Sequence, residues 1–94
     1  TVPSHDVLID IKKAALSVEG VLGVHNVKIN YIGPYASLDL HVEVTDDLTL
    51  KEAHKIAHDV EKKVIEGVEV VTIVNVHVCP KGDGFCVESV NRRF

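Results

Sequence analysis

The chain has 94 residues, 46% of them apolar and 26% charged, with a formal net charge of −4. This size and composition fit a single globular domain with one modest core. An acidic chain with no Trp, two Phe and two Tyr has neither a basic surface nor an aromatic stacking platform, so we expect no nucleic-acid partner. The longest apolar stretch, residues 70–78, is too short to span a bilayer.

The first residue is Thr1 and no signal peptide is evident, so we expect a segment cut from a longer chain. The two cysteines, Cys79 and Cys86, are able to form a disulfide. Two thiols beside several histidines do not resemble a secreted disulfide scaffold, however, and we therefore expect a reducing cytoplasm.

A first helix is predicted over residues 6–18, because apolar residues recur there at spacings of three and four. Ser4 is the candidate N-cap and Gly20 the terminator. Two antiparallel strands are predicted next, over residues 27–32 and 38–44, joined by a short turn at Gly33-Pro34.

In the second of these strands Leu38, Leu40, Val42 and Val44 form the apolar face, and His41 lies on the polar face, pointing away from the core.

Residues 49–52 form a capping box, which predicts the start of a second helix that ends near Gly67. Six apolar residues form one stripe along it: Leu50, Ala53, Ile56, Ala57, Val60 and Val64. His54 and His58 are four residues apart on one flank of this helix. That spacing is able to hold a metal ion, although such a pair is more often simply solvated.

A third strand is predicted over residues 68–79. Its inner face should carry Val70, Val74, Val76 and Val78, and its outer face Asn75, His77 and Cys79. His77 and Cys79 therefore point the same way, and imidazole with thiolate suits zinc better than calcium or magnesium. One His and one Cys near a strand end are nevertheless more often just packed or exposed side chains.

The α-β-β-α-β order predicts an α+β fold, an open-faced sandwich with two helices on one face of a three-stranded mixed sheet. It resembles a ferredoxin-like or metallochaperone-like fold without its first strand. A right-handed crossover should make the second and third strands parallel. If those strands are neighbours, His41, His77 and Cys79 share the uncovered face, and His25 arrives from the loop before the first strand. A tetrahedral zinc site needs three or four such ligands from separate segments.

Four segments in this order resemble the cytoplasmic C-terminal domain of cation diffusion facilitator transporters. They are Gly20–His25, Leu40–Val42, Leu50–His54 and Val76–Pro80, and the resemblance covers roughly residues 5 to 80. It implies a cytoplasmic regulatory and dimerisation domain over residues 1–80, followed by a C-terminal tail over residues 81–94.

The resemblance implies that the domain forms a homodimer, attached to the membrane domain of the same transporter at the cytoplasmic face of the cell membrane. It also implies that His25, His41, His54 and His77 bind divalent metal ions at or near the subunit interface. Cys79 occupies a position where relatives often carry Asp, and a thiolate there should favour zinc or cadmium over manganese. Zn²⁺ is therefore the expected ion, with other divalent transition metals as alternatives.

We thus expect a metal-sensing and dimerisation domain of a zinc efflux transporter. Two alternatives remain, a constitutive dimerisation domain without a regulatory metal site and a free-standing metal-binding carrier. Related metallochaperones use a Cys-x-x-Cys loop, which this sequence lacks. No Ser-His-Asp or Cys-His-acid arrangement is discernible, so we do not expect an enzyme.

Overall fold

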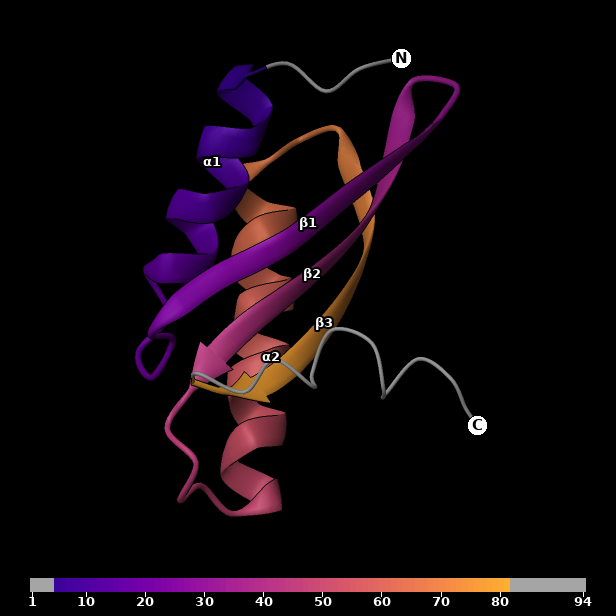
Figure 1. Ribbon diagram of the computed structural model, residues 1–94. Helices are drawn as coiled ribbons and strands as arrows, with labels where there is room; N and C mark the ends of the chain where they lie inside the picture. Colours follow the sequence, from indigo (N-terminus) through magenta and orange to yellow (C-terminus); the bar gives the residue numbers. More distant parts are fainter. Residues whose placement is uncertain (1–4, 82–94) are drawn as a thin grey trace.

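The computed structural model describes residues 5–81. Two helices and three strands follow one another as α1 (His5–Leu16), β1 (Gly23–Ile32), β2 (Tyr35–Val44), α2 (Leu50–Gly67) and β3 (Val71–Pro80) (Figure 1). This order confirms the predicted α-β-β-α-β arrangement. Ser4, the expected N-cap of the first helix, and the expected tail beyond Lys81 lie outside the described residues.

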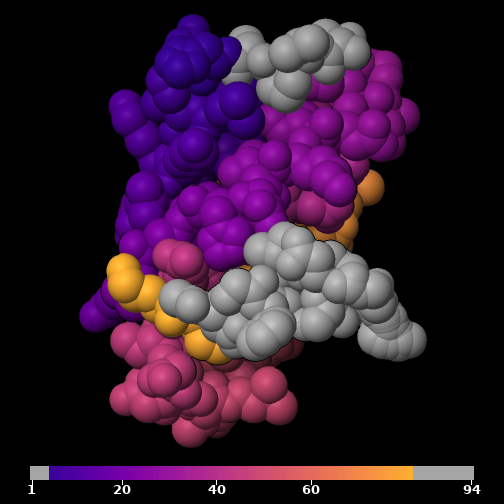
Figure 2. All heavy atoms as spheres, viewed as in Figure 1, coloured from indigo at the N-terminus to yellow at the C-terminus, as the bar shows by residue number. Residues whose placement is uncertain are grey.

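The three strands form one mixed sheet in the order β1-β2-β3. β1 and β2 are antiparallel, and β2 and β3 are parallel neighbours connected through α2, as predicted. Figure 1 views the sheet from its open side, with α2 behind the strands and α1 at the left. Seen as spheres from the same side, α1 and β1 cover the left and upper part of the surface, and the start of α2 lies at the bottom (Figure 2).

The core lies between the helices and the inner face of the sheet. Its centre is β2, whose inward residues Leu38, Leu40, Val42 and Val44 are all buried as predicted. Ile11 and Ala15 from α1 and Ile56, Val60 and Val64 from α2 close the core from the other side. A strand with a fully apolar inner face and a polar outer face is the pattern expected for a sheet covered on one side only.

α2 begins with the predicted capping box. The Thr49 side chain accepts a hydrogen bond from the Glu52 backbone N–H over 3.1 Å, and Glu52 Oε1 accepts one from the Thr49 N–H over 2.8 Å. The prediction that Leu50 belongs to the buried stripe is wrong, because this side chain is 87% exposed. It lies in the first turn of α2, before the helix reaches the sheet.

Each edge strand contains an irregularity that changes its alternation. On β1, His25 pairs with His41 and Lys28 with Asp39. Two residues of β1 therefore lie between these pairs, opposite a single residue of β2, which is a β-bulge. Asn26 lies within this bulge with φ of 53°, a left-handed conformation that Asn adopts more readily than most residues.

On β3, Val71 pairs with Ala36 and Ile73 with Ser37, which also leaves one extra residue on the edge strand. Val71 is therefore the residue buried at the start of β3, at 2% exposure. Val70 itself precedes β3, and it is partly buried against the core, so the expectation that it faces inward holds although uninterrupted alternation does not. Beyond the irregularity, Val74, Val76 and Val78 pack toward the core as predicted.

The two leucines Leu40 and Leu50 provide a test of this core. Leu40→Ala should lower the free energy of unfolding by about 2–5 kcal/mol, because it leaves a cavity in the central strand. Leu50→Ala should change it by no more than about 0.5 kcal/mol, because this side chain is exposed. Urea denaturation of both variants measures the difference, and equal losses of stability would contradict the packing described here.

Candidate metal centre

Three histidines form a row across the open face of the sheet. His25 on β1 pairs with His41 on β2, which in turn pairs with His77 on β3. Their rings stack, with centroids 5.3 Å apart for His25 and His41 and 4.6 Å apart for His41 and His77. The parallel register of β2 and β3 thus brings together the imidazoles that the sequence assigned to the uncovered face.

His25 reaches this row from within β1, so the expectation that it lies in a preceding loop is wrong. Strict alternation back from Ile29 and Val27, which pack against the core, would turn His25 toward the core as well. The bulge at Asn26 adds one residue and so turns His25 to the open face.

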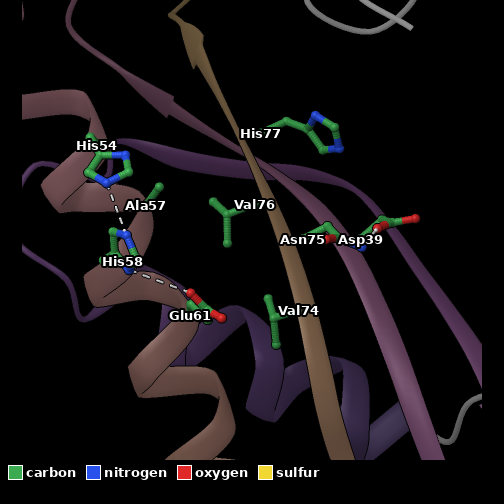
Figure 3. Close-up of a pocket in the computed structure, with 9 residues that line it drawn as sticks. All are labelled: Asp39, His54, Ala57, His58, Glu61, Val74, Asn75, Val76 and His77. Atoms are coloured by element: carbon green, nitrogen blue, oxygen red, sulfur yellow. Dashed lines mark hydrogen bonds and ion pairs between the residues drawn. The ribbon is translucent and has the colours of Figure 1, made fainter. Parts of the chain in front are cut away.

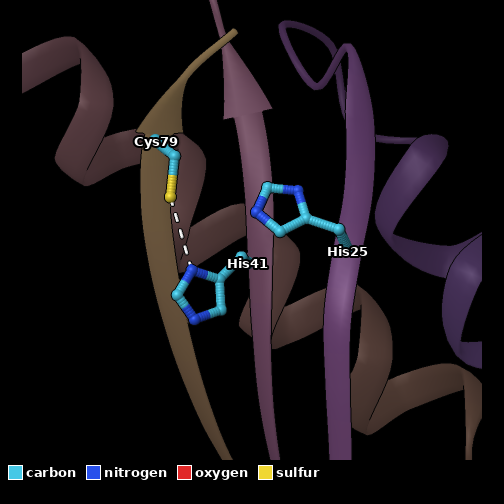
Figure 4. A group of neighbouring side chains, drawn as sticks. All are labelled: His25, His41 and Cys79. Carbon is cyan, nitrogen blue, oxygen red and sulfur yellow. Dashed lines mark hydrogen bonds between the residues drawn. The ribbon is translucent and has the colours of Figure 1, made fainter. Parts of the chain in front are cut away.

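Cys79 joins two members of the row to form a compact group of potential ligands. One donor atom from each of His25, His41 and Cys79 lies within 4.8 Å of the others (Figure 4). His41 Nδ1 is 3.4 Å from Cys79 Sγ. In a tetrahedral zinc site, with bonds of about 2.0–2.1 Å to nitrogen and about 2.3 Å to sulfur, these two atoms would be about 3.5 Å apart. The pair is therefore already spaced for one ion, and His25, whose donor atom lies within 4.8 Å of both, has to move closer.

The oxidation state of Cys79 differs from the expected one. Cys79 is disulfide-bonded in the structure, and no described cysteine is free. The other cysteine of the sequence, Cys86, lies outside the described residues. The expectation of a reduced thiolate at Cys79 therefore does not hold for this state, and reduction is needed before the sulfur becomes an anionic metal ligand.

His41 is the more enclosed of the two histidines in the group. It is 6% exposed although it lies on the face that the helices leave uncovered. Burial, and then the neighbouring charges of His77 and His25, lower the pKa of His41 below its ordinary value of 6.5, while Asp39 opposes this shift. Neutral imidazole is the form that binds metals, so the surroundings of His41 favour its ligating state.

Glu43 is a neighbour that the sequence reasoning missed. Its Oε2 lies 3.6 Å from His25 Nδ1, and a carboxylate beside a histidine is a common means of orienting a ligating ring. Glu43 is two residues from His41 on the same strand, so the alternation of β2 already placed both on the open face.

The remaining two predicted ligands lie apart from this group. His77 stacks on His41, but its nitrogens are not among the clustered donor atoms. His54 lies on α2, where its partner is His58. Figure 3 shows His77 on β3 pointing away from α2, and His54 lies on α2 across the groove that both residues line. The described monomer therefore brings together three of the five predicted ligands.

Comparison with known families agrees with this architecture. Residues 3–81 match the model of a family described as "Cation efflux protein, cytoplasmic domain". The chain belongs to this cation efflux family. The match confirms the resemblance inferred from the four sequence segments.

Curated relatives of this cation efflux domain are transport proteins. An uncharacterised transporter of Methanocaldococcus jannaschii is 43% identical over 68 residues, which are 72% of this chain and 24% of the transporter. The manganese efflux system protein MneS of Bacillus subtilis is 30% identical over 69 residues, 73% of this chain and 23% of that protein. The chain thus spans about a quarter of the length of the curated relatives it matches.

Solved structures with the same fold include two variants of MamM CTD. One in a nickel form has a TM-score of 0.80 at 26% identity, covering 83% of this chain and 99% of that chain. One in a cadmium form has a TM-score of 0.79 at 25% identity, covering 82% of this chain and 96% of that chain. Between His5 and Lys81, the cation efflux domain has no helix with the length and apolar character needed to cross a membrane.

The lowered pKa of His41 predicts how the metal-free domain responds to pH. The unfolded chain holds the His41 proton more tightly than the folded chain, so this residue's contribution to stability is present above about pH 6.5 and is lost as the pH falls. Urea unfolding in the presence of a chelator, between about pH 5 and 8, should show a smaller acid loss for His41→Gln than for the unsubstituted chain. An equal loss in both would contradict the assignment, as would a gain of stability on acidification.

Proposed function

We propose that the chain is the metal-sensing and dimerisation domain of a divalent-cation efflux transporter, and that zinc is its effector. The observation that carries this proposal is the convergence of donor atoms from His25, His41 and Cys79 within 4.8 Å, on a domain of the cation efflux family. The site would be regulatory rather than catalytic, since the chain belongs to a family of cation efflux domains.

The donor set supports a borderline-soft divalent metal. Two imidazoles and one thiolate are ligands typical of zinc and cadmium, whereas manganese prefers carboxylate and other oxygen ligands. The names of related proteins mention manganese efflux and the titles of related structures mention nickel and cadmium forms. These names support a divalent transition metal in general, and the sulfur of Cys79 is the reason to propose zinc for this chain.

Three ligands leave a fourth position for water or for a ligand from a second copy. His77 is suited to that role because it lies next to His41 but outside the compact group. Large apolar side chains, among them Ile32, Tyr35 and Ile73, remain exposed on the described part of the chain and support a second copy as partner.

Metal binding would act on the arrangement of the two copies. Each copy has a formal charge of −4, so the copies repel one another, and a bound cation reduces that repulsion. An ion shifts the pair toward one arrangement only if it binds that arrangement more tightly. We therefore propose that zinc favours a closer dimer, and that the membrane portion of the transporter responds to this change.

Zinc titration of the reduced chain tests the site. Calorimetry near about pH 7.5 should show binding at micromolar zinc, accompanied by proton release, and His41→Ala should abolish it because this ring lies between the other ligands. His5→Ala is the matched control, since His5 is an exposed histidine on α1 and outside the cluster. Absence of binding below millimolar zinc would remove the sensing function.

Sedimentation of the same samples separates the sensing function from constitutive dimerisation. A dimer whose affinity and shape are unchanged by zinc, and unchanged by His77→Ala with Cys79→Ser, would favour the constitutive alternative. A dimer that becomes more compact with zinc, and loses this response in the double variant, supports the sensing function.

The disulfide at Cys79 predicts that zinc affinity depends on reduction. A dithiol reductant supplies two electrons and two protons to cleave the S–S bond and is itself oxidised to a cyclic disulfide. The zinc affinity of the chain should rise on this treatment, because a thiolate replaces a neutral disulfide sulfur. Calorimetry of the oxidised chain, and of the chain after reduction and removal of the dithiol under nitrogen, measures the change. Cys79→Ser should bind with the same lower affinity in both states, and equal affinities for the unsubstituted chain would exclude Cys79 as a ligand.

A further inference from the structure

We infer that the C-terminal tail supplies a fourth strand to the sheet. In this arrangement residues 85–91 pair antiparallel with the free edge of β3, and a disulfide between Cys79 and Cys86 holds them there. Residues 82–94 are not among those that the structure describes, so the docking site is defined by β3 and its surroundings. This site lies at the edge of the sheet and does not rest on zinc sensing.

β3 offers a free edge to a further strand. Within residues 5–81 it pairs with β2 alone. The Lys81 N–H donates to the Val44 carbonyl over 2.8 Å, which directs the backbone groups of Lys81 toward β2. Since these groups alternate in direction along a strand, those of Val78, Val76 and Val74 point to the free edge. Such a row of backbone groups is a template for another strand.

A groove of about 520 Å³ lies beside this edge, between β3 and α2 (Figure 3). β3 contributes residues 74–77 to its lining, and α2 contributes Ala57, whose small side chain leaves room for a neighbouring backbone. Val76 and Val78 are partly buried against the core. The edge therefore offers both hydrogen-bonding groups and apolar side chains, which are the two elements of recognition by strand addition.

The disulfide at Cys79 is the reason to name the tail as the occupant. Cys86 is the only other cysteine in the sequence, so it is the available partner within one chain. A disulfide requires Cα atoms about 4.4–6.8 Å apart, so a bond between these residues requires the chain to reverse direction directly after β3. Gly82 and Gly84 lie in this interval, and glycine is favoured in tight turns. The reversal leads the tail back along the free edge.

Pairing Cys79 with Cys86 fixes the register of the added strand. Cys79 directs its backbone groups to β2, as Lys81 does, so it occupies a non-hydrogen-bonded position toward a strand on the free edge. Opposite Cα atoms at such positions are about 4.5 Å apart, which a disulfide spans without distortion. Residues 81–84 are then a four-residue loop, a common length in β-hairpins.

The side chains of the tail suit this register. Val87 is opposite Val78, so it continues the apolar inner face of the sheet. Glu88 is opposite His77 on the open face, where a carboxylate attracts a protonated imidazole. The added strand therefore presents an apolar residue to the core side and a charged residue to the open side, as β2 does.

Proline substitutions in the 94-residue chain test both the pairing and its register. In this register the Ser89 N–H points to Val76 on β3, and the Glu88 N–H points to solvent. Ser89→Pro should therefore disrupt the strand, whereas Glu88→Pro should preserve it, because an edge strand tolerates proline where its N–H faces solvent. Hydrogen–deuterium exchange followed by NMR measures the difference. The Val76 amide should exchange at least about tenfold faster in Ser89→Pro than in Glu88→Pro or in the unsubstituted oxidised chain.

The Leu40 amide on the central strand is the control, and it should exchange equally in both variants if the domain remains folded. In the unsubstituted chain, nuclear Overhauser spectra should show a contact between the Hα atoms of His77 and Glu88, which face one another at a non-hydrogen-bonded position. Dithiothreitol supplies two electrons and two protons to the S–S bond and becomes a cyclic disulfide. This reduction should raise the exchange rate of Val76, because it releases the tether.

Equal exchange rates of Val76 in the two proline variants would overturn the inference. A disulfide that joins two copies of the chain, seen as a dimer in non-reducing electrophoresis, would overturn it as well, since the edge of β3 would then be left to a second copy.

Discussion

The parallel pairing of β2 with β3 is the constraint on which the rest of the structure depends. It places β2 in the middle of the sheet, so that its inner face forms the centre of the core and its outer face lies between two neighbours. Because paired residues point the same way, His41 on the middle strand is flanked by His25 and His77. The burial and the lowered pKa of His41 both follow from this central position.

The order of elements, the capping box and the apolar face of β2 were predictable because each depends on local pattern. Two of the predictions that failed, for His25 and for Cys79, depend on pairing with another strand or on a covalent bond. Val71 is buried although alternation did not assign it to the inner face, and His25 lies in a strand and not in a loop, because bulges are defined by the pairing of two strands. The disulfide at Cys79 depends on redox conditions that residue spacing does not encode. The stacked row follows from the register of all three strands. The sequence predicted that His41 and His77 share a face, but not that His25 pairs with His41.

Five of the six histidines of this domain lie in two groups. One group lies on the open face of the sheet and is built from strands that are far apart in sequence. The other lies along one helix, and its spacing is set by the helix alone. The first group exists only when the sheet is formed, whereas the second requires little more than α2. Their donor sets also differ, since sulfur is present only on the sheet.

The bulge at Asn26 determines which face of the sheet His25 occupies, although Asn26 is not one of the clustered ligands. It allows Ile29 to enter the core and His25 to face outward on the same strand, although both have odd positions. The number of residues in this short stretch therefore matters as much as their identity. A homologous chain one residue shorter here would retain every donor atom in its sequence and yet present only two of them to the ion.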